Sequence, residues 1–267
     1  MSHVGVGLLT EERLAAIRAL VGEHGSVRVG DLVRRLGASR ETVRRDLAEL
    51  ERLGALRRVH GGAVAAGQRG ALEPLFSTRK VSMLAEKRAI AAATTALVAE
   101  GESVYLDLGT TVLEVARQLA GRRLTLITNS VPAALAALHT PGSTVVLLGG
   151  TLRPGDRAVS GAETLRGLGA YYVDKAILGA GGLSVTTGLT DYHIEEAAVR
   201  REAIARAHQT VVASDHTKFG LTGVAAVCPI DRVGHVVTDW GVDPADLEAL
   251  QTAGVAVTVA PAPDVNP

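Results

Sequence analysis

The stretch SRETVRRDLAELERLGALRRVHGGA, at positions 39–63, constrains the fold more than any other part of the chain. Its apolar residues Val43, Leu47 and Leu50 recur at i, i+4 and i+7, which predicts a helix with one buried face, and Ser39 stands where it can cap that helix. The residues on or near the outward face of its first turns are Arg40, Thr42, Arg44 and Arg45. We therefore expect a helix with one face for a core and another for an anion.

The neighbouring segments extend this helix into a larger unit. Residues 29–37 (VGDLVRRLG) predict a short helix ended by a glycine, so the pair has the form of a helix-turn-helix whose second member enters a DNA groove. Gly54 is expected to end the second helix, and residues 56–59 and 62–65 flank a turn suited to a small β wing. The candidate DNA contacts are Ser39, Arg40, Thr42, Arg44 and Arg45, together with Arg58 and His60 on the wing, which we expect to touch the DNA backbone. The alternative interpretation, an arginine-rich helix that is only solvated, explains neither the preceding helix nor the wing.

Charge is unevenly divided along the chain. A hydrophobic content of 47% indicates a folded protein, and a length of 267 residues is enough for one or two domains. The formal net charge of the whole chain is zero. Residues 1–66 contain 11 arginines and no lysine against eight acidic residues, a net charge of +3, and the remainder carries −3. The asymmetry has the sign expected if the N-terminal part meets phosphates, as double-stranded DNA would require.

Several other classes of protein are disfavoured. The single cysteine, Cys228, excludes an internal disulfide and fits a reducing cytoplasm, and no signal-peptide pattern opens the chain. Residues 124–152 lack Asp, Glu, Lys and Arg and could span a membrane, but prolines, glycines and polar residues divide the run into pieces that read as two buried strands around a helix. The histidines show no metal-ligand spacing, so we expect no metal, cofactor or membrane partner.

From residue 81 onward, apolar β-branched strands alternate with helices. Strands are predicted at 103–107, 124–128, 144–148, 175–178, 210–214, 235–238 and 255–259, and helices at 86–98, 111–119, 131–138, 194–207 and 244–251. This order predicts an α/β domain with a mainly parallel sheet covered on both faces, in which ligands bind at the carboxyl ends of the strands. The expected organisation is a winged helix-turn-helix in 1–66, with a first helix from Thr10 bracing it, a linker in 67–80, a sensor domain in 81–260 and a loose tail in 261–267.

A family resemblance rests on both halves. The motif residues Ser39, Thr42, Val43, Arg44, Arg45, Asp46, Leu47, Leu50, Glu51, Gly54, Arg58, His60, Gly61, Gly62 and Ala63 resemble the signature of the DeoR family of bacterial transcriptional regulators. The second half resembles that family's sensor domain at Glu86-Lys87-Arg88, Asp107 to Thr111, Thr128-Asn129-Ser130, Gly149-Gly150, Gly179 with Gly182, Glu195-Glu196-Ala197 and Ser214 to Gly220. Ser214 departs from the pattern, since alanine is usual there.

The resemblance implies a fold and a function. The family's sensor domain is similar in fold to phosphosugar isomerases, its usual effectors are phosphorylated sugars, and most members are repressors. The resemblance therefore implies an operator-binding regulator that carries out no catalysis. Because a lone winged helix binds weakly, we expect a homodimer or homotetramer that is assembled through the sensor domain and acts in the cytoplasm or on the nucleoid.

One strand end predicts a phosphate site. Asp107, Gly109, Thr110 and Thr111 follow a strand and open a helix, so a glycine, backbone N–H groups and two hydroxyls face whatever lies above the helix N-terminus. Threonine is also an ordinary helix cap, so spacing alone leaves phosphate binding open, and the family resemblance favours it.

Other strand ends supply further effector candidates. These are Thr128, Asn129 and Ser130, which could equally be a helix cap; Gly181 and Gly182, which could be plain turn glycines; and Glu195, Asp215 and Lys218. Lys218 could pair with phosphate and Asp215 could accept sugar hydroxyls, with a structural Asp–Lys pair as the alternative. The rival function is an active sugar-phosphate isomerase carrying a DNA-binding module, with Asp107, Asp215 or a helix-opening Glu as general base.

Overall fold

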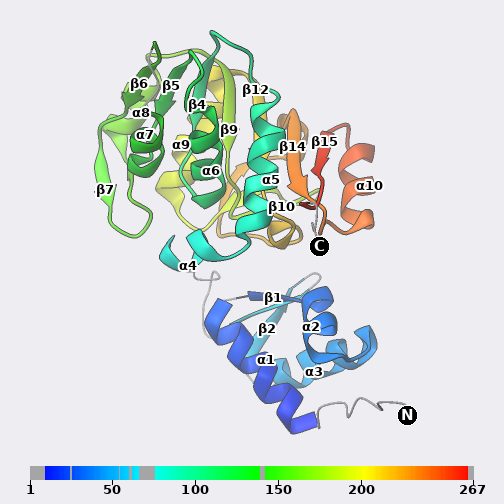
Figure 1. Ribbon diagram of the computed structural model, residues 1–267. Coiled ribbons are helices and arrows are strands. Elements are labelled where there is room, and N and C mark those ends of the chain that lie inside the picture. Colours follow the sequence, from blue (N-terminus) through cyan, green and yellow to red (C-terminus); the bar gives the residue numbers. More distant parts are fainter. Residues whose placement is uncertain are drawn as a thin grey trace. The chain divides into compact units, whose positions relative to one another are not determined.

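A computed structural model describes residues 10–24, 26–53, 55–59, 62–65, 76–138 and 142–263. The chain forms two compact units, Met1–Pro74 and Leu75–Pro267 (Figure 1). His60 and Gly61 of the predicted wing turn, Gly54, the predicted linker as far as residue 75 and the end of the predicted tail lie outside the described residues.

The first unit is a three-helix domain with a small antiparallel sheet. Its helices are α1 (Thr10–His24), α2 (Val29–Leu36) and α3 (Arg40–Arg52), and its sheet has the strand order β1 (Ser26–Arg28), β3 (Gly62–Ala65), β2 (Leu56–Val59). Helices α2 and α3 and the β2–β3 wing match the predicted segments closely. Strand β1 was not anticipated; it pairs with β3, and a Cβ atom on Gly62 would lie 2.0 Å from the carbonyl oxygen of Val27, so only glycine fits there.

The apolar stripe of α3 forms the core of this unit. Val43, Leu47 and Leu50 are at most 1% exposed and pack with Ile17 and Val21 of α1. Helix α1 therefore braces the helix-turn-helix, as the sequence predicted. Full burial of an aliphatic side chain contributes about 1.5 to 3 kcal/mol, so these contacts fix the orientation of α3 and leave its opposite face outside the core.

The second unit is built on a seven-stranded sheet. Its order is β15 (Ala256–Ala260), β14 (His235–Asp239), β12 (Ala207–Ala213), β9 (Val173–Leu178), β4 (Ser103–Leu106), β5 (Thr125–Thr128), β6 (Thr144–Leu147). Every neighbouring pair in this sheet is parallel, as the alternation of strands and helices predicted.

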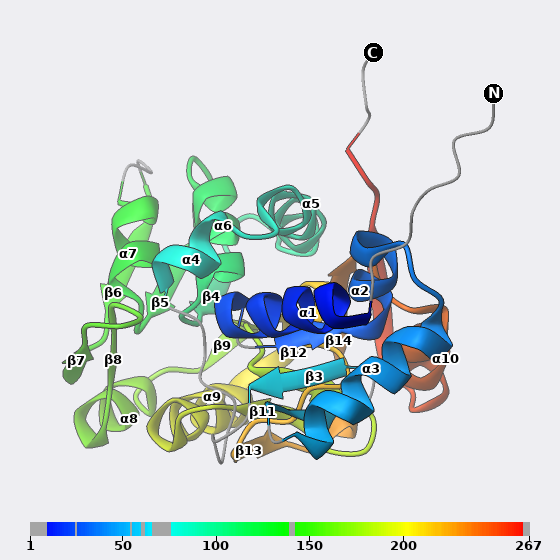
Figure 2. The same ribbon diagram turned by 90° about the horizontal axis from the view of Figure 1, so that it is seen from below.

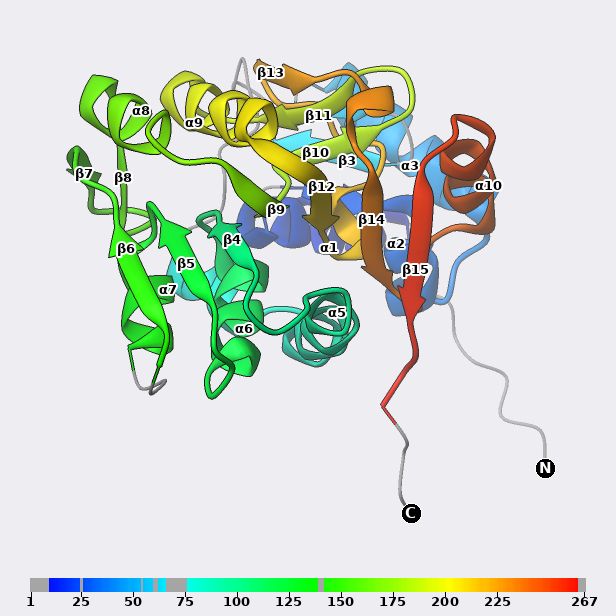
Figure 3. The same cartoon turned by 90° about the horizontal axis from the view of Figure 1, so that it is seen from above.

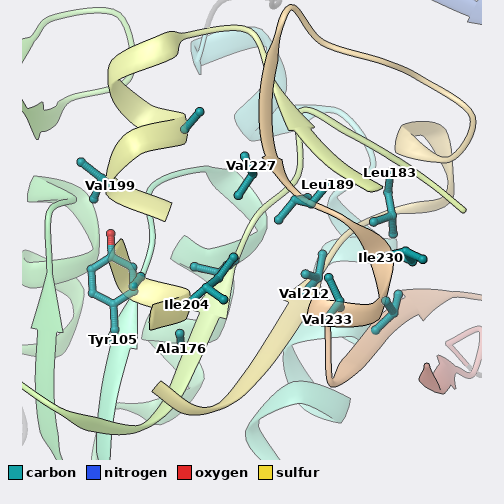
Figure 4. Packing of buried hydrophobic residues seen from close by; sticks show 14 of the residues in the cluster. Tyr105, Ala176, Leu183, Leu189, Val199, Ile204, Val212, Val227, Ile230 and Val233 are labelled. Carbon is teal, nitrogen blue, oxygen red and sulfur yellow. The ribbon is translucent and has the colours of Figure 1, made fainter. Parts of the chain in front are cut away.

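Helices cover both faces of this sheet (Figure 3). One face carries α5 (Leu84–Thr95), α6 (Thr110–Leu119) and α7 (Val131–Ala137), and the other carries α8 (Ala162–Leu168) and α9 (Ile194–Arg206), with α10 (Pro244–Thr252) beside β15. Each face has its own buried cluster. The buried cluster under α9 includes Val199 of α9, Val212 of the seven-stranded sheet and Leu189 of a second, smaller sheet, so it joins the two sheets (Figure 4).

Several short elements were not anticipated from the sequence. They are the smaller antiparallel sheet β10 (Gly182–Ser184), β11 (Gly188–Asp191) and β13 (Ala225–Cys228), the hairpin β7 (Thr151–Arg153) and β8 (Ala158–Ser160), the single-turn helices η1 (His216–Lys218) and η2 (Ile230–Arg232), and helix α4 (Phe76–Val81). Helix α4 lies in the range we assigned to the linker, and it belongs to the second compact unit. Among the described residues, no helix combines the length and hydrophobicity needed to cross a membrane.

The strand order reverses between β4 and β9. From β4 the chain moves outward through β5 to β6, and it then returns to the other side of β4 to build β9, β12, β14 and β15. The helices that follow β4 and precede β12, α6 and α9, lie on opposite faces. In open α/β sheets, ligands bind at the carboxyl ends of the strands where such a reversal occurs.

Candidate nucleic-acid interface and sensor site

Helix α3 presents its arginines outward. Ser39 caps it by accepting a hydrogen bond from the backbone N–H of Thr42 at 3.1 Å, as predicted. Arg40, Arg44 and Arg45 are exposed, and within the described part of the chain the side chains of Arg44 and Arg45 form no ion pair or hydrogen bond. These two guanidinium groups are thus available to an anion, which is what binding of the helix to DNA requires.

Two acidic residues of the motif, Asp46 and Glu51, form contacts within this unit. Asp46, 5% exposed, accepts two hydrogen bonds from Arg13 of α1, at 2.5 and 3.0 Å. This bidentate pair ties α3 to α1 and raises the pKa of Arg13. On the wing, Arg58 is exposed and its backbone N–H donates to the Glu51 carboxylate at 2.7 Å, so β2 is tied to the end of α3.

The carboxyl end of β4 leads into an uncapped helix at the point of strand reversal. Gly109 precedes α6 with φ of 113°, a conformation that L side chains rarely adopt, and no side chain caps the helix. Thr110 and Thr111 are buried in its first turn, and apart from Gly109 and its two chain neighbours no residue has an atom within 4 Å of the place a Cβ of Gly109 would occupy. Free backbone N–H groups at a helix N-terminus favour an anion.

Asp107, at the same strand end, is held by a buried ion triad that the sequence did not reveal. Its Oδ2 accepts hydrogen bonds from Arg200 of α9 at 2.6 Å and from the backbone N–H of Gly179 at 3.1 Å. The same guanidinium pairs with Asp191 at the end of β11. All three charged side chains are at most 5% exposed. The triad thus joins β4, β9, β11 and α9 where the strand order reverses.

The polar residues after β5 are engaged within the protein. Thr128 donates to the carbonyl of Leu106 at 2.6 Å, and Ser130 caps α7 through the N–H of Ala133. Asn129, which is fully buried, accepts from the Tyr105 hydroxyl and donates to the carbonyl of Val159. For Ser130 the helix-cap interpretation is confirmed. The described contacts of all three residues fix the shape of this loop.

The remaining candidates lie at the neighbouring strand ends. Gly181 and Gly182 pack against backbone, since Cβ atoms there would lie 2.9 and 2.3 Å from the carbonyl oxygens of Thr190 and Leu221. Glu195 is exposed and accepts from Ser160 at 2.9 Å.

Asp215 and Lys218 follow β12. Asp215 caps η1 by accepting from the N–H of Thr217 at 3.1 Å, and the half-buried Lys218 amine lies 5.9 Å from the Tyr192 ring centroid. Beside them, His216 shares a 2.7 Å hydrogen bond with Asp239. Burial opposes ionisation of Asp239, but this hydrogen bond and the charge of His216 outweigh it, and the pKa of Asp239 is lowered.

Lys87, in the first turn of α5, is a further buried charge at this edge. It is 4% exposed, and its amine donates to the carbonyl oxygens of Arg79 and, at 2.8 Å, Ser82. Burial lowers the pKa of Lys87 to about 8, while the nearby charge of Asp215 raises it and that of Lys218 lowers it. The resemblance picked out Glu86-Lys87-Arg88, but no pattern assigned Lys87 a role.

Replacement of Lys87 tests this burial. The ordinary pKa of a lysine amine, which applies in the unfolded chain, is 10.5. Below pH 8 the Lys87 amine is therefore charged in both the folded and the unfolded protein, and between pH 8 and 10.5 it is charged only in the unfolded protein. The stability of the parent relative to Lys87→Met should therefore rise with pH across that window, by up to about 3 kcal/mol, and stay constant below it. Urea unfolding of both proteins from pH 6 to 10.5 measures the difference. A difference independent of pH would contradict the burial of a charged amine.

Two other possibilities receive no support from the geometry. Burial raises the pKa of Cys228 to about 11, so its thiol is not an activated nucleophile at neutral pH. Within the ranges that the structure describes, no group of three or more His, Cys, Asp or Glu side chains is placed to hold a metal ion.

Comparison with known proteins decides the family. Residues 13–69 match the model of the DeoR-like helix-turn-helix domain, and residues 82–240 match that of the DeoR C-terminal sensor domain. The chain belongs to the DeoR family. Among DeoR-family relatives, the uncharacterised transcriptional regulator YulB of Bacillus subtilis is 34% identical, covering 95% of this chain and 98% of that protein. The transcriptional repressor AccR of Agrobacterium fabrum is 36% identical, covering 87% and 90%.

Half of the chain also aligns with a solved enzyme structure. Ribose 5-phosphate isomerase A from Methanocaldococcus jannaschii aligns with 50% of this chain and 53% of its own, with a TM-score of 0.37 and 21% identity.

Proposed function

We propose that this DeoR-family regulator is a repressor of sugar catabolism genes whose operator binding is changed by a phosphorylated sugar. The observation that carries the proposal is the exposure of Arg44 and Arg45 on a helix whose other face is the core of a DeoR-type DNA-binding domain. The name of the relative AccR, a transcriptional repressor, favours repression over activation.

On the DNA side, α3 would lie in the major groove with its N-terminal half toward the bases. Arginine contacts either guanine edges or phosphates, so Arg44 and Arg45 supply the main energy, with Ser39, Arg40 and Thr42 beside them at the helix start. Arg58, and His60 two residues after it, would contact the DNA backbone from the wing. Because one winged helix covers one half-site, we propose a homodimer or homotetramer assembled through the sensor unit and acting on DNA in the cytoplasm.

On the effector side, the phosphate would bind at the N-terminus of α6. Three features support this position: the missing cap at Gly109, the open space beside it, and the location at the strand reversal. Thr110 and Thr111 would contribute N–H groups, and Lys218 a positive charge. The acceptors for the sugar hydroxyls would be the carboxylates of Asp215, Glu195 and Asp107. The Oδ1 atom of Asp107 has no hydrogen-bond partner in the described ranges.

The other candidates would act on the effector indirectly. The side chains of Thr128, Asn129 and Ser130 already form hydrogen bonds within the protein, and Gly181 and Gly182 pack against backbone. We assign these five residues the role of shaping the pocket wall.

The rival function, sugar-phosphate isomerisation, is less well supported. A general base must be free to take a proton, whereas the Asp107 carboxylate shares its charge with Arg200 and a backbone N–H group. The names of the relatives are those of transcriptional regulators.

An operator titration tests the proposal. A labelled duplex selected by the protein from a random pool is titrated with the chain in the presence of glucose 6-phosphate, fructose 1-phosphate, fructose 6-phosphate or ribose 5-phosphate, each beside its unphosphorylated sugar. We expect one phosphate ester to change the operator Kd by at least fivefold and its parent sugar to have no effect. Tight operator binding that no ester shifts would refute the sensor half, and turnover of an ester by the protein would favour the rival.

A further inference from the structure

Helix α4 is fastened to the carboxyl edge of the sensor sheet by an ion pair. Arg79, near its C-terminal end, pairs with the carboxylate of Asp156, which lies between β7 and β8 and is 3% exposed. Phe76, at the other end of α4, is buried, with the guanidinium groups of Arg79 and Arg157 each 5.8 Å from its ring centroid. A six-residue helix is not stable alone, so these contacts decide its position.

Lys87 of α5 is a second anchor for the C-terminal end of α4. The Lys87 amine donates to the carbonyl of Arg79 and to that of Ser82, and a positive charge is favourable at a helix C-terminus. The charges that act on Lys87 include Asp215 and Lys218, two of the proposed effector contacts. Figure 2 shows α4 beside α6, the helix whose N-terminus is the proposed phosphate site.

A chain of ion pairs continues from the first anchor to helix α9, whose Arg200 holds the strand end of β4. Asp156 also pairs with Arg153, and the Arg153 guanidinium contacts Glu196 in the first turn of α9 and, at 2.9 Å, His193. Further along α9, Arg200 holds Asp107. The contacts that position α4 are therefore continuous with the elements that shape the proposed pocket.

Helix α4 stands at the point in the sequence where the sensor unit follows the DNA-binding unit. Strand β3 of the DNA-binding unit ends at Ala65, and α4 begins at Phe76, so among the described residues α4 is the first element of the sensor unit that follows the DNA-binding unit. Any change in where α4 is held alters the point from which the DNA-binding unit is tethered.

We propose that α4 transmits the state of the sensor pocket to the DNA-binding unit, with Arg79 and Lys87 as the positioning residues that hold it. This inference rests on the proposed function. An effector that binds the carboxyl edge more tightly in one α4 arrangement than in the other shifts the population between them, and the operator affinity changes by at most this difference in binding free energy. Without its anchors, α4 no longer distinguishes the two states.

The test compares Arg79→Ala with Lys80→Ala in the full chain. Lys80 is an exposed lysine on the same helix, so its loss controls for charge and helix propensity. With the selected duplex and the sugar phosphate that shifts the parent, we expect the effector-induced change in operator Kd to fall to less than twofold in Arg79→Ala. Calorimetry should show the Kd for that sugar phosphate within twofold of the parent. Lys80→Ala should behave as the parent, and Arg79→Lys should recover part of the response.

A second arm needs no effector. Hydrogen exchange of the α4 amides should be at least tenfold faster in Arg79→Ala and Lys87→Met than in Lys80→Ala, and the operator Kd of both anchor variants should differ from the parent by at least threefold. Melting of the sensor unit shows whether each variant is folded. If folded Arg79→Ala keeps the parental operator Kd, or keeps the parental effector response, α4 is not the transmitting element. If the parent itself shows no effector response, the proposed function fails separately and the effector-free arm still decides the role of α4.

Discussion

The double variant Arg44→Ala/Arg45→Ala should bind the selected operator about 30-fold or more weakly than the parent, because each arginine contact with a base or phosphate is worth about 1 to 3 kcal/mol. Both side chains are exposed and, within the described ranges, unpaired, so their removal costs the fold little. Thermal unfolding should therefore stay within about 0.5 kcal/mol of the parent. Fluorescence anisotropy at several salt concentrations measures the loss, and the salt slope should fall by about one for each phosphate contact removed.

Arg52→Ala is the matched control for this variant. Arg52 ends the same helix, is exposed and pairs with Glu49. We expect it to change operator affinity by less than about threefold, because its charge lies at the far end from the groove-reading turns. Parental operator binding by Arg44→Ala/Arg45→Ala would mean that another surface reads the DNA.

Replacement of Arg200 by Met should destabilise the sensor unit by about 3 to 5 kcal/mol, the largest stability loss that we expect from one substitution outside the hydrophobic cores. The substitution leaves the carboxylates of Asp107 and Asp191 buried without their cation, and breaking a buried ion pair by removing one partner has a cost of this size. Denaturant unfolding followed by a probe in the sensor unit measures the loss. Effector binding should weaken with it, because the triad fixes the loops at the strand reversal.

Two further variants show whether charge is the cause. Arg201→Met removes the exposed neighbouring arginine, and we expect a loss below about 1 kcal/mol. The triple variant Asp107→Asn/Asp191→Asn/Arg200→Met contains no buried charge at these positions and should recover more than half of the stability lost by Arg200→Met. Equal destabilisation by Arg200→Met and Arg201→Met would show that the triad is not the main structural link.

The main architecture could be predicted because burial leaves a clear pattern. The segments VYL in β4 and TLIT in β5 are buried almost throughout, and a parallel sheet requires such continuous apolar runs. The shorter elements carry no comparable pattern. The three-residue strand β10 has too few positions to show a period, and the six residues of α4 owe their helical state to contacts with Asp156 and Lys87.

The candidate site could be predicted as a set of loops but not as a set of contacts. Parallel strands bring Asp107, Asn129 and Asp215 to one edge whatever their partners are. The partner of Asp107 lies 93 residues away, and adjacent arginines at 200 and 201 look alike in the sequence. The one available signal was helical spacing: Arg200 stands four residues after Glu196, on the buried face of α9. Burial of a charged residue depends on a partner, which single-sequence periodicity does not identify.

The central claim is that one chain couples sugar phosphate binding to operator binding, and reciprocity tests it most directly. The operator Kd is measured by anisotropy with and without the sugar phosphate that binds, and the Kd for that ester is measured by calorimetry with and without saturating operator duplex. The two ratios must be equal, and we expect a value between about 5 and 150. If the ester binds the free and the DNA-bound protein with the same Kd, the sensor unit does not regulate DNA binding and the account is contradicted.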